Sequence, residues 1–405
     1  MGNSIYPVPS AGASYSSQPP ATASSVLLDG QLVTASSIST SITGTGAPWL
    51  LYANGAGTTT ITIAGTPYTV TAGSTVGTSA YTGSQSVTVA TGFATTAPAT
   101  FTASTMPSTS YWSGVTYGNG YYVAVANGPT TAGAYSTNGT SWTASTLPSS
   151  SNWQSVTYGN GYYVAVAQGP STASAYSTNG STWTASTLPF SSNWSSVTYG
   201  NGYYVAVCNS PNNAYSTNGT SWTSSSMPSN ANWSGVAYGL IGATNYYVAV
   251  QASSTTAGAY STNGTTWSAS TMTSNNTWSS VTYGNGKFVA VQNSGTTNAN
   301  YSTNGTTWTA STMPSATQWQ SVTYGNGYFV AVQQSGSGAG AYSLNGTTWT
   351  ATSSFPSSSS WQSVIWGNGY YVAVQNSGTT NGAYFAQSVL TPVAYGIYNG
   401  ATVRA

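Results

Sequence analysis

One stretch of the chain reads Trp153-Gln-Ser-Val-Thr-Tyr-Gly-Asn-Gly-Tyr-Tyr-Val-Ala-Val166 and, after a loop, Ala175-Tyr-Ser-Thr-Asn-Gly-Ser-Thr-Trp-Thr-Ala-Ser-Thr-Leu-Pro189. Close copies of this stretch follow one another along most of the sequence. The leading tryptophan recurs at steps of 39 to 45 residues, as Trp112, Trp153, Trp194, Trp233, Trp278, Trp319 and Trp361. A period of about 40–45 residues with four short strands in each unit is typical of β-propeller blades.

Each copy contains four segments that we expect to be strands. In the quoted copy they are residues 153–158 (strand a), 162–167 (strand b), 175–178 (strand c) and 182–186 (strand d). Asn-Gly pairs precede strands b and d, and this pair favours tight hairpins because both turn positions need a positive φ. Strand b is apolar on both faces, which is typical of a strand packed between neighbouring sheets. The chain is therefore expected to be all-β.

The two ends of the repeat predict how the ring closes. Strand a occurs seven times but the tryptophan of strand d only six times, because the seventh copy stops at Gly382-Ala-Tyr-Phe385. The segment Ala99-Thr-Phe-Thr-Ala-Ser-Thr-Met-Pro107 precedes the first copy and matches strand d, with Phe101 at the tryptophan position. We therefore predict a seven-bladed β-propeller over residues 99–386, closed by a strand at 99–105. Closure protects strand edges at which other chains could pair.

Charge is nearly absent from the chain. Its 405 residues include two Lys or Arg, one Asp or Glu and no His, and these ionisable residues are Asp29, Lys287 and Arg404. General acid–base chemistry normally needs His, Asp, Glu or Lys, and metal sites need clusters of ligands. We therefore expect no enzyme, no catalytic residue, no metal and no cofactor. Without a basic patch, nucleic-acid binding by phosphate neutralisation is excluded as well.

The turn before strand d carries a resemblance to a known family. Ser302-Thr-Asn-Gly-Thr-Thr-Trp308 resembles the Asp-box of sialidase-type propellers, Ser-x-Asp-x-Gly-x-Thr-Trp, but is one residue shorter and has Asn for Asp. Similar turns begin at Ser136, Ser177, Ser216, Ser261 and Ser343. The resemblance implies a blade architecture and not an activity, because the sialidase catalytic set needs arginines, an acid and a Tyr–Glu pair. Residues 99–386 contain no Arg, Asp or Glu.

The segments outside the repeat are expected to attach the protein to a larger assembly. Residues 1–25 are rich in Ser, Ala and Pro, and predict an extended N-terminal arm. Residues 26–98 contain alternating Thr, Ile and Val, and predict a small β domain. Residues 387–405 are expected to be a strand-forming C-terminal tail. No run of 18 apolar residues is present, so we expect no membrane insertion.

The first residue of strand b supplies candidate ligand-binding residues. This position holds Lys287 in the fifth copy and tyrosine in the others, as Tyr121, Tyr162, Tyr203, Tyr246, Tyr328 and Tyr370. Because a lysine is accommodated at one place, we expect the position to be exposed. Exposed aromatic rings suit flat sugar faces or protein partners. Packing at the rim of the propeller would explain the same tyrosines without a ligand, and the next position, such as Tyr122, is expected to be core.

The loop between strands b and c is a second candidate, on the opposite face. It varies most among the copies, as a comparison of residues 127–133 with the shorter 209–213 shows. Variable loops on a rigid scaffold are frequent binding sites. Drift of an unconstrained loop would explain the variation equally well.

These observations favour a non-catalytic structural or adhesive protein on the surface of a virus particle. In its repetitive, uncharged sequence the chain resembles propellers of bacteriophage virion and tail-fibre proteins. That resemblance implies a capsid decoration or tail-fibre-like component, which is released by lysis and needs no export signal. The expected partners are other virion proteins, through the N-terminal region, and host-surface carbohydrate. A soluble β-propeller lectin is the alternative.

Overall fold

The computed structural model describes two compact units made of β-strands. The described residues are 25–28, 31–34, 38–53, 58–64, 66–71, 75–90, 97–253, 255–334, 340–353, 355–356, 360–376, 382–386 and 395–399. One unit comprises Ala97–Gln387, and the other combines Met1–Thr96 with Ser388–Ala405. Across the described residues, no helix has the length and apolar character needed to cross a membrane.

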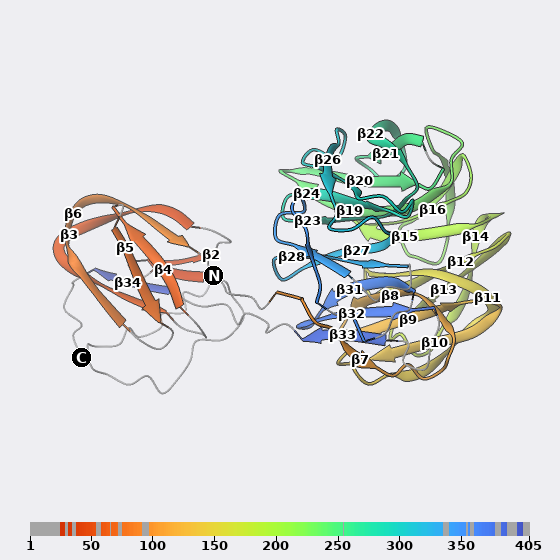
Figure 1. Cartoon of the computed structure of the whole chain (residues 1–405), viewed down its shortest axis with the longest axis horizontal. Helices are drawn as coiled ribbons and strands as arrows, with labels where there is room; N and C mark the ends of the chain where they lie inside the picture. The colour runs from red at the N-terminus through yellow and green to blue at the C-terminus, as the bar shows by residue number, and fades with distance from the viewer. Residues whose placement is uncertain are drawn as a thin grey trace. The chain divides into compact units, whose positions relative to one another are not determined.

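The larger unit is a ring of four-stranded antiparallel blades (Figure 1). The first blade consists of β8 (Tyr111–Gly118), β9 (Tyr121–Asn127), β10 (Thr130–Ser136) and the first part of β11 (Thr143–Gly159). The second blade consists of the rest of β11 with β12 (Tyr162–Gln168), β13 (Ser171–Ser177) and β14 (Thr184–Ser192). Because β11 runs on from the outer strand of one blade to the inner strand of the next, the first two blades form one continuous seven-stranded sheet.

Four further blades repeat the same meander, each starting at its buried tryptophan. The third is β15 (Trp194–Gly200), β16 (Tyr203–Cys208), β17 (Asn212–Ser216) and β18 (Thr223–Ser226). The fourth is β19 (Trp233–Ile241), β20 (Thr244–Gln251), β21 (Thr255–Ser261) and β22 (Ser268–Asn276). The fifth is β23 (Trp278–Gly284), β24 (Lys287–Gln292), β25 (Asn298–Ser302) and β26 (Thr309–Thr312). The sixth is β27 (Trp319–Gly325), β28 (Tyr328–Gln333), β29 (Gly340–Ser343) and β30 (Thr350–Ala351).

The seventh blade is assembled from both ends of the propeller sequence. It contains β31 (Trp361–Gly367), β32 (Tyr370–Gln375), β33 (Gly382–Ala386) and β7 (Thr102–Ser104). The short strand β7 pairs antiparallel with β33, in the register Ala103↔Ala383, and Figure 1 shows orange β7 beside blue β33. The outer strand of the last blade is thus supplied by residues that precede the first blade.

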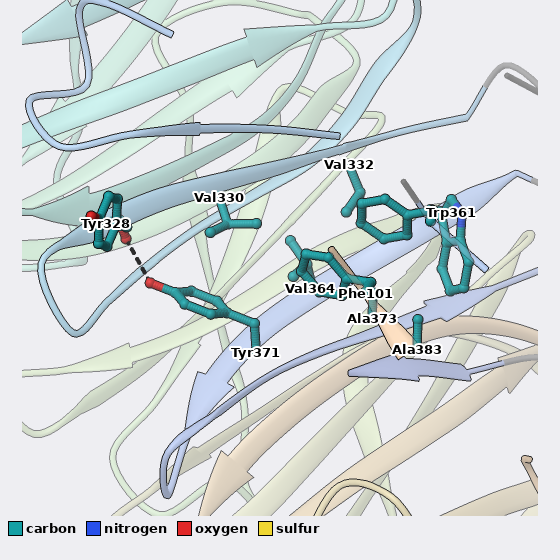
Figure 2. Packing of buried hydrophobic residues seen from close by; sticks show 10 residues of the cluster. Phe101, Tyr328, Val330, Val332, Trp361, Val364, Tyr371, Ala373 and Ala383 are labelled. Atoms are coloured by element: carbon teal, nitrogen blue, oxygen red, sulfur yellow. Dashed lines mark hydrogen bonds between the residues drawn. The ribbon is translucent and has the colours of Figure 1, made fainter. Parts of the chain in front are cut away.

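Phe101 fills the core of this composite blade. It is 3% exposed and stacks on Phe355 with ring centroids 4.2 Å apart. Figure 2 shows it among Val332, Val364 and Trp361, where the tryptophan of strand d would stand in the other blades. Phe355 thus contributes a second aromatic ring to the core at this position.

The leading tryptophans form the core between blades. All seven, named above, are fully buried. Nearer the axis, the glycine that ends each inner strand lies against an aromatic ring of the next blade. A Cβ on Gly159, for example, would come within 2.0 Å of the Tyr199 ring, so only glycine fits this contact. The repeated Tyr-Gly pair in strand a is therefore the seam by which neighbouring blades meet.

The smaller unit contains a seven-stranded sheet in the order β2-β1-β34-β3-β6-β4-β5. Its strands are β1 (Ser25–Leu28), β2 (Gln31–Thr34), β3 (Ile38–Ala53), β4 (Thr58–Ile63), β5 (Thr66–Thr71), β6 (Thr75–Ala90) and β34 (Tyr395–Asn399). Residues 387–405 were expected to be a strand-forming tail, and their strand β34 pairs parallel with β1 and antiparallel with β3 within this sheet. The expected arm at 1–25 lies outside the described residues except for Ser25.

Candidate functional site

The candidate tyrosines at the start of strand b form a rim on one face of the propeller, where the a–b and c–d turns open. Each packs against the tyrosine of strand c in its own blade, with ring centroids 5.8 to 6.5 Å apart. Tyr162, for example, meets Tyr176 edge to face at 5.8 Å. The expectation that this position is exposed is wrong: five of the six rings are half-buried, and Tyr328 is only 7% exposed. The cross-strand tyrosine covers one side of each ring.

Lys287 occupies the same rim position in the fifth blade and adopts a comparable packing. Its ammonium lies 5.5 Å from the centre of the Tyr301 ring, which is the strand-c tyrosine of that blade. The Nζ atom also donates a hydrogen bond of 2.8 Å to the backbone oxygen of Asn345 in the next blade. The lysine is accommodated because its stem can lie along an aromatic face while its charge stays near solvent.

The next residue along strand b is structural. Tyr163 is fully buried, and its hydroxyl donates to the backbone oxygen of Gly118 in the preceding blade. The same bond joins four other blade pairs, through Tyr122 to Gly367, Tyr204 to Gly159, Tyr247 to Gly200 and Tyr371 to Gly325. Burial raises the pKa of each of these five phenols well above the usual value, with a smaller contribution from neighbouring tyrosines.

The c–d turns are held by an asparagine side chain. In the second blade, Asn179 Oδ1 accepts hydrogen bonds from the Ser177 hydroxyl (3.1 Å) and from the backbone N–H groups of Ser181 (3.0 Å) and Thr182 (2.9 Å). Only Gly180 has a positive φ, of 71°. The expectation that both residues of this Asn-Gly pair have positive φ is therefore wrong for the c–d turn. It is right for the a–b turn, where Asn160 and Gly161 have φ of 44° and 84°.

The acceptor role of Asn179 explains how asparagine stands where an Asp-box has aspartate. The oxygen only accepts hydrogen bonds here, and an amide oxygen can do so as well as a carboxylate oxygen. The same three bonds hold the other five turns, whose asparagines are Asn138, Asn218, Asn263, Asn304 and Asn345.

Two exposed leucines on this face were not foreseen as candidates. Leu240 is 48% exposed in the a–b hairpin of the fourth blade, and Leu344 is 61% exposed in the c–d turn of the sixth. The fourth hairpin is longer than the others because β19 and β20 continue to Ile241 and from Thr244. The 45-residue step from Trp233 to Trp278 was the signal in the sequence.

The b–c loops on the opposite face are shorter than expected. In the first blade β9 reaches Asn127 and β10 begins at Thr130, so only Gly128 and Pro129 connect the strands. Asn127 Nδ2 donates to Gln154 Oε1 (2.6 Å) and to a further glutamine of the second blade. These hydrogen bonds join the first two blades, although Gln168 itself remains exposed. Residues 335–339 and 377–381, in the corresponding loops of the last two blades, lie outside the described part.

No group of three or more His, Cys, Asp or Glu that could bind a metal occurs among the described residues. Lys287 is the charged residue of the described propeller, and it is hydrogen-bonded as given above. Cys208 is buried, and desolvation raises the pKa of its thiol to about 11. A thiol with a raised pKa is mostly protonated near neutral pH and is a poor nucleophile. Asp29 and Arg404 lie outside the described residues.

Comparisons with known proteins identify structures with a similar fold, but no family to which the chain belongs. No protein-family model matches the chain, and no curated protein matches it. Among solved structures, virginiamycin B lyase from Staphylococcus aureus is similar with a TM-score of 0.60 and 12% identity, covering 69% of this chain and 95% of the lyase.

Two further solved structures are similar to this chain. YCF48 bound to D1 peptide has a TM-score of 0.55 and 14% identity, covering 71% of this chain and 94% of that one. The WD40 β-propeller domain of Doa1 has a TM-score of 0.55 and 13% identity, with coverages of 70% and 95%. At these identities the likeness shows the fold alone. It confirms an all-β propeller repeat, and carries no relationship to sialidases or to bacteriophage proteins.

Proposed function

We propose that this chain is a non-catalytic binding protein displayed on a bacteriophage particle, with the propeller as its rigid display module. The propeller fold is consistent with a protein-binding or lectin-like role. The observation that supports the proposal is repetition: the rim presents the same Tyr-on-Tyr arrangement in six blades. Equivalent sites around a ring suit multivalent binding, in which several weak contacts give strong attachment.

The composition argues against catalysis. Virginiamycin B lyase shares the propeller fold, and a variant of it in which alanine replaces one histidine is described as catalytically inactive. The present chain has no histidine and a single acid, so it lacks the residue type on which that lyase depends. A site built from one half-buried tyrosine pair per blade offers ring surface and hydroxyl groups, which suit sugar faces better than proton transfer near neutral pH.

The virion assignment is tested by the composition of purified particles. Quantitative mass spectrometry of virus particles from the source of the sequence should find the chain at a fixed copy number relative to the major capsid protein. Absence of the chain from such particles would overturn the assignment. In that case, binding of the secreted or released chain to glycans would favour the second candidate, a soluble lectin.

The rim is tested separately, with the full chain on a panel of glycans. Replacement of Tyr121, Tyr162 and Tyr203 by leucine keeps apolar packing and removes the aromatic faces. A matched control replaces three exposed strand-d threonines, Thr143, Thr184 and Thr223, by serine. Glycan binding is expected to fall for the tyrosine variant and to stay for the control. Equal binding by both variants, at equal melting temperature, would exclude the rim as the site.

A further inference from the structure

The a–b and c–d turns of the propeller contain two classes of Asn-Gly pair, which differ in their hydrogen bonds and backbone conformation. One class lies in six a–b turns: Asn326 of the sixth blade makes a further interaction, and the other five are Asn119, Asn160, Asn201, Asn285 and Asn368. The other lies in the c–d turns, with Asn138, Asn179, Asn218, Asn263, Asn304 and Asn345. Asn-Gly is the sequence in which succinimide formation is least hindered, because glycine has no side chain to block attack by its own nitrogen.

The c–d class is fixed by hydrogen bonds at the atoms that must move. Asn138 Oδ1 accepts from the Ser136 hydroxyl and from the backbone N–H groups of Thr140 and Ser141, at 2.9 to 3.0 Å. The nitrogen that would attack, in Gly139, donates at 2.8 Å to Ser136 Oγ, and Gly139 is buried. Both the electrophile and the nucleophile are therefore held away from reaction.

The a–b class has none of these restraints. Among the described residues, the carboxamides of the five a–b asparagines make no hydrogen bond, and the glycine nitrogens that follow them make none either. The asparagines have φ of 39° to 47°, a region that L-residues rarely adopt. Asn119 and Gly120 are both exposed, and a Cβ at Gly120 would meet nothing within 4 Å. The turn can therefore rearrange without displacing a neighbour.

We propose that these five a–b asparagines are sites of spontaneous deamidation, and that the six c–d asparagines are protected by their turns. The backbone nitrogen of the glycine, after losing its proton to solvent, bonds to the asparagine Cγ. The Cγ–Nδ2 bond breaks and ammonia leaves, which closes a succinimide ring. Water then opens either C–N bond of the ring and yields aspartate or isoaspartate.

Deamidation would change the surface charge of this propeller more than that of a protein with an ordinary number of charged residues. Each conversion adds a negative charge to a chain with a formal net charge of +1 and a single natural acid. Because the five sites are equivalent turns, the charges would form a ring of carboxylates beside the rim tyrosines. The uncharged face would become acidic as the protein ages, and its contacts would become dependent on salt.

The test compares the two classes within one molecule. The full chain is incubated at mildly alkaline pH, digested with chymotrypsin, and each peptide is followed by the mass increase that accompanies replacement of NH₂ by OH. The a–b sites are expected to react roughly tenfold faster or more, since each bond that must open in a c–d turn contributes several-fold to an equilibrium. In denaturant the difference should vanish, because both classes share the Asn-Gly sequence.

A variant separates the turn bonds from other causes. Ser136→Ala removes the hydroxyl that contacts both Asn138 and Gly139, so Asn138 should react faster than in the wild-type chain, although the N–H groups of Thr140 and Ser141 still hold its oxygen. Asn179, in an unchanged turn, is the internal control. Equal rates for the two classes in the folded wild-type chain, or faster reaction in the c–d class, would overturn the proposal whether or not the variant folds.

Discussion

At the scale of single residues, substitution of the buried tyrosines measures how much their hydroxyl hydrogen bonds between neighbouring blades contribute to stability. Tyr163→Phe removes the bond to Gly118 and keeps the ring. The fifth and sixth blades already carry Phe288 and Phe329 at this position, so the substitution fits the fold. We expect a loss of about 1–2 kcal/mol in the free energy of unfolding, because a buried carbonyl group loses its donor. Chemical denaturation measures it.

The matched control for that prediction is Tyr199→Phe. The Tyr199 ring packs on Tyr204 in the same way as Tyr158 packs on Tyr163, but its hydroxyl makes no hydrogen bond within the described residues. The free energy of unfolding of this variant should lie within about 0.5 kcal/mol of the wild-type value. If both variants lost the same amount, the ring packing and not the hydrogen bond would hold the seam.

The strand-c residue beside the strand-d tryptophan of the next blade differs between two pairs of neighbouring blades. Between the third and fourth blades the Asn213 carboxamide, oriented to satisfy both neighbours, donates to Ser225 and accepts from Trp267 Nε1 at 3.0 Å. Gly258 holds the equivalent strand-c position one blade later. There the indole nitrogen of Trp308 has no hydrogen-bond partner among the described residues.

Gly258→Asn is therefore expected to stabilise the protein by up to about 1 kcal/mol, by supplying the missing acceptor and by reducing the freedom of the unfolded chain. A Cβ there would lie 2.7 Å from Ser270 Oγ and 3.4 Å from Met272 Sδ, which are ends of flexible side chains, and 3.7 Å from the Ala249 backbone oxygen. Gly258→Ala separates the effect of the amide from that of the Cβ. A melting temperature for the asparagine variant below that of the alanine variant would refute the analogy.

At the scale of elements, the sequence predicted the strands that repeat from blade to blade, and missed side-chain contacts that depend on the register between strands. Strand b was predicted at 162–167 and is Tyr162–Gln168, because its Tyr-Val-Ala-Val run is buried on both faces. The rim tyrosines were expected to be exposed, since nothing in the linear order shows that Tyr162 meets Tyr176 of the neighbouring strand. Their cross-strand contact comes from register, which only the folded sheet reveals.

The Asn-Gly pairs act differently in the two kinds of turn, although their local sequence is the same. The Asn-Gly pair was expected to act through backbone conformation in both hairpins, and it does so at Asn160. In the c–d turn the side chain of Asn179 stabilises the hairpin instead, because its oxygen accepts a hydrogen bond from the hydroxyl of Ser177, two residues earlier. In the smaller unit no repeat guides pairing, so the position of β34 between β1 and β3 could not be predicted from the sequence.

At the scale of the whole molecule, near-absence of charge makes stability insensitive to pH until the tyrosines ionise. The five buried phenols at the blade seams have a raised pKa, so unfolded tyrosines lose protons before the folded ones as pH rises past 10.0. Buried Cys208 acts in the same direction above 9.0. Stability from these groups is thus fully present below about pH 9 and lost at higher pH.

We therefore expect the melting temperature to vary by less than about 4 °C between roughly pH 4 and 9, equivalent to about 1 kcal/mol, and to fall above pH 10. Calorimetry over this range measures both parts. Tyr163→Phe should make the alkaline fall less steep, because one shifted group is removed. A large change between pH 4 and 9 would show that other groups control stability.

The repeated rim and the contacts between neighbouring blades all require a closed ring, so ring closure is the central claim about this molecule. In the closed ring, β7 pairs with β33 and Phe101 packs on Phe355. Two fragments differ in residues 97–107, which include this strand, Phe101 and the buried Met106: residues 97–387 contain the segment and residues 108–387 lack it. Losing a buried aromatic residue alone costs about 3–5 kcal/mol, and the cut also opens a strand edge to other chains.

The measurement is thermal unfolding of the two fragments side by side, with light scattering to report association. The account predicts that 97–387 is monomeric and unfolds in one transition, whereas 108–387 associates or melts lower by roughly 6 °C or more. If 108–387 is monomeric and melts at the same temperature as 97–387, the N-terminal strand does not close the ring and the account is contradicted.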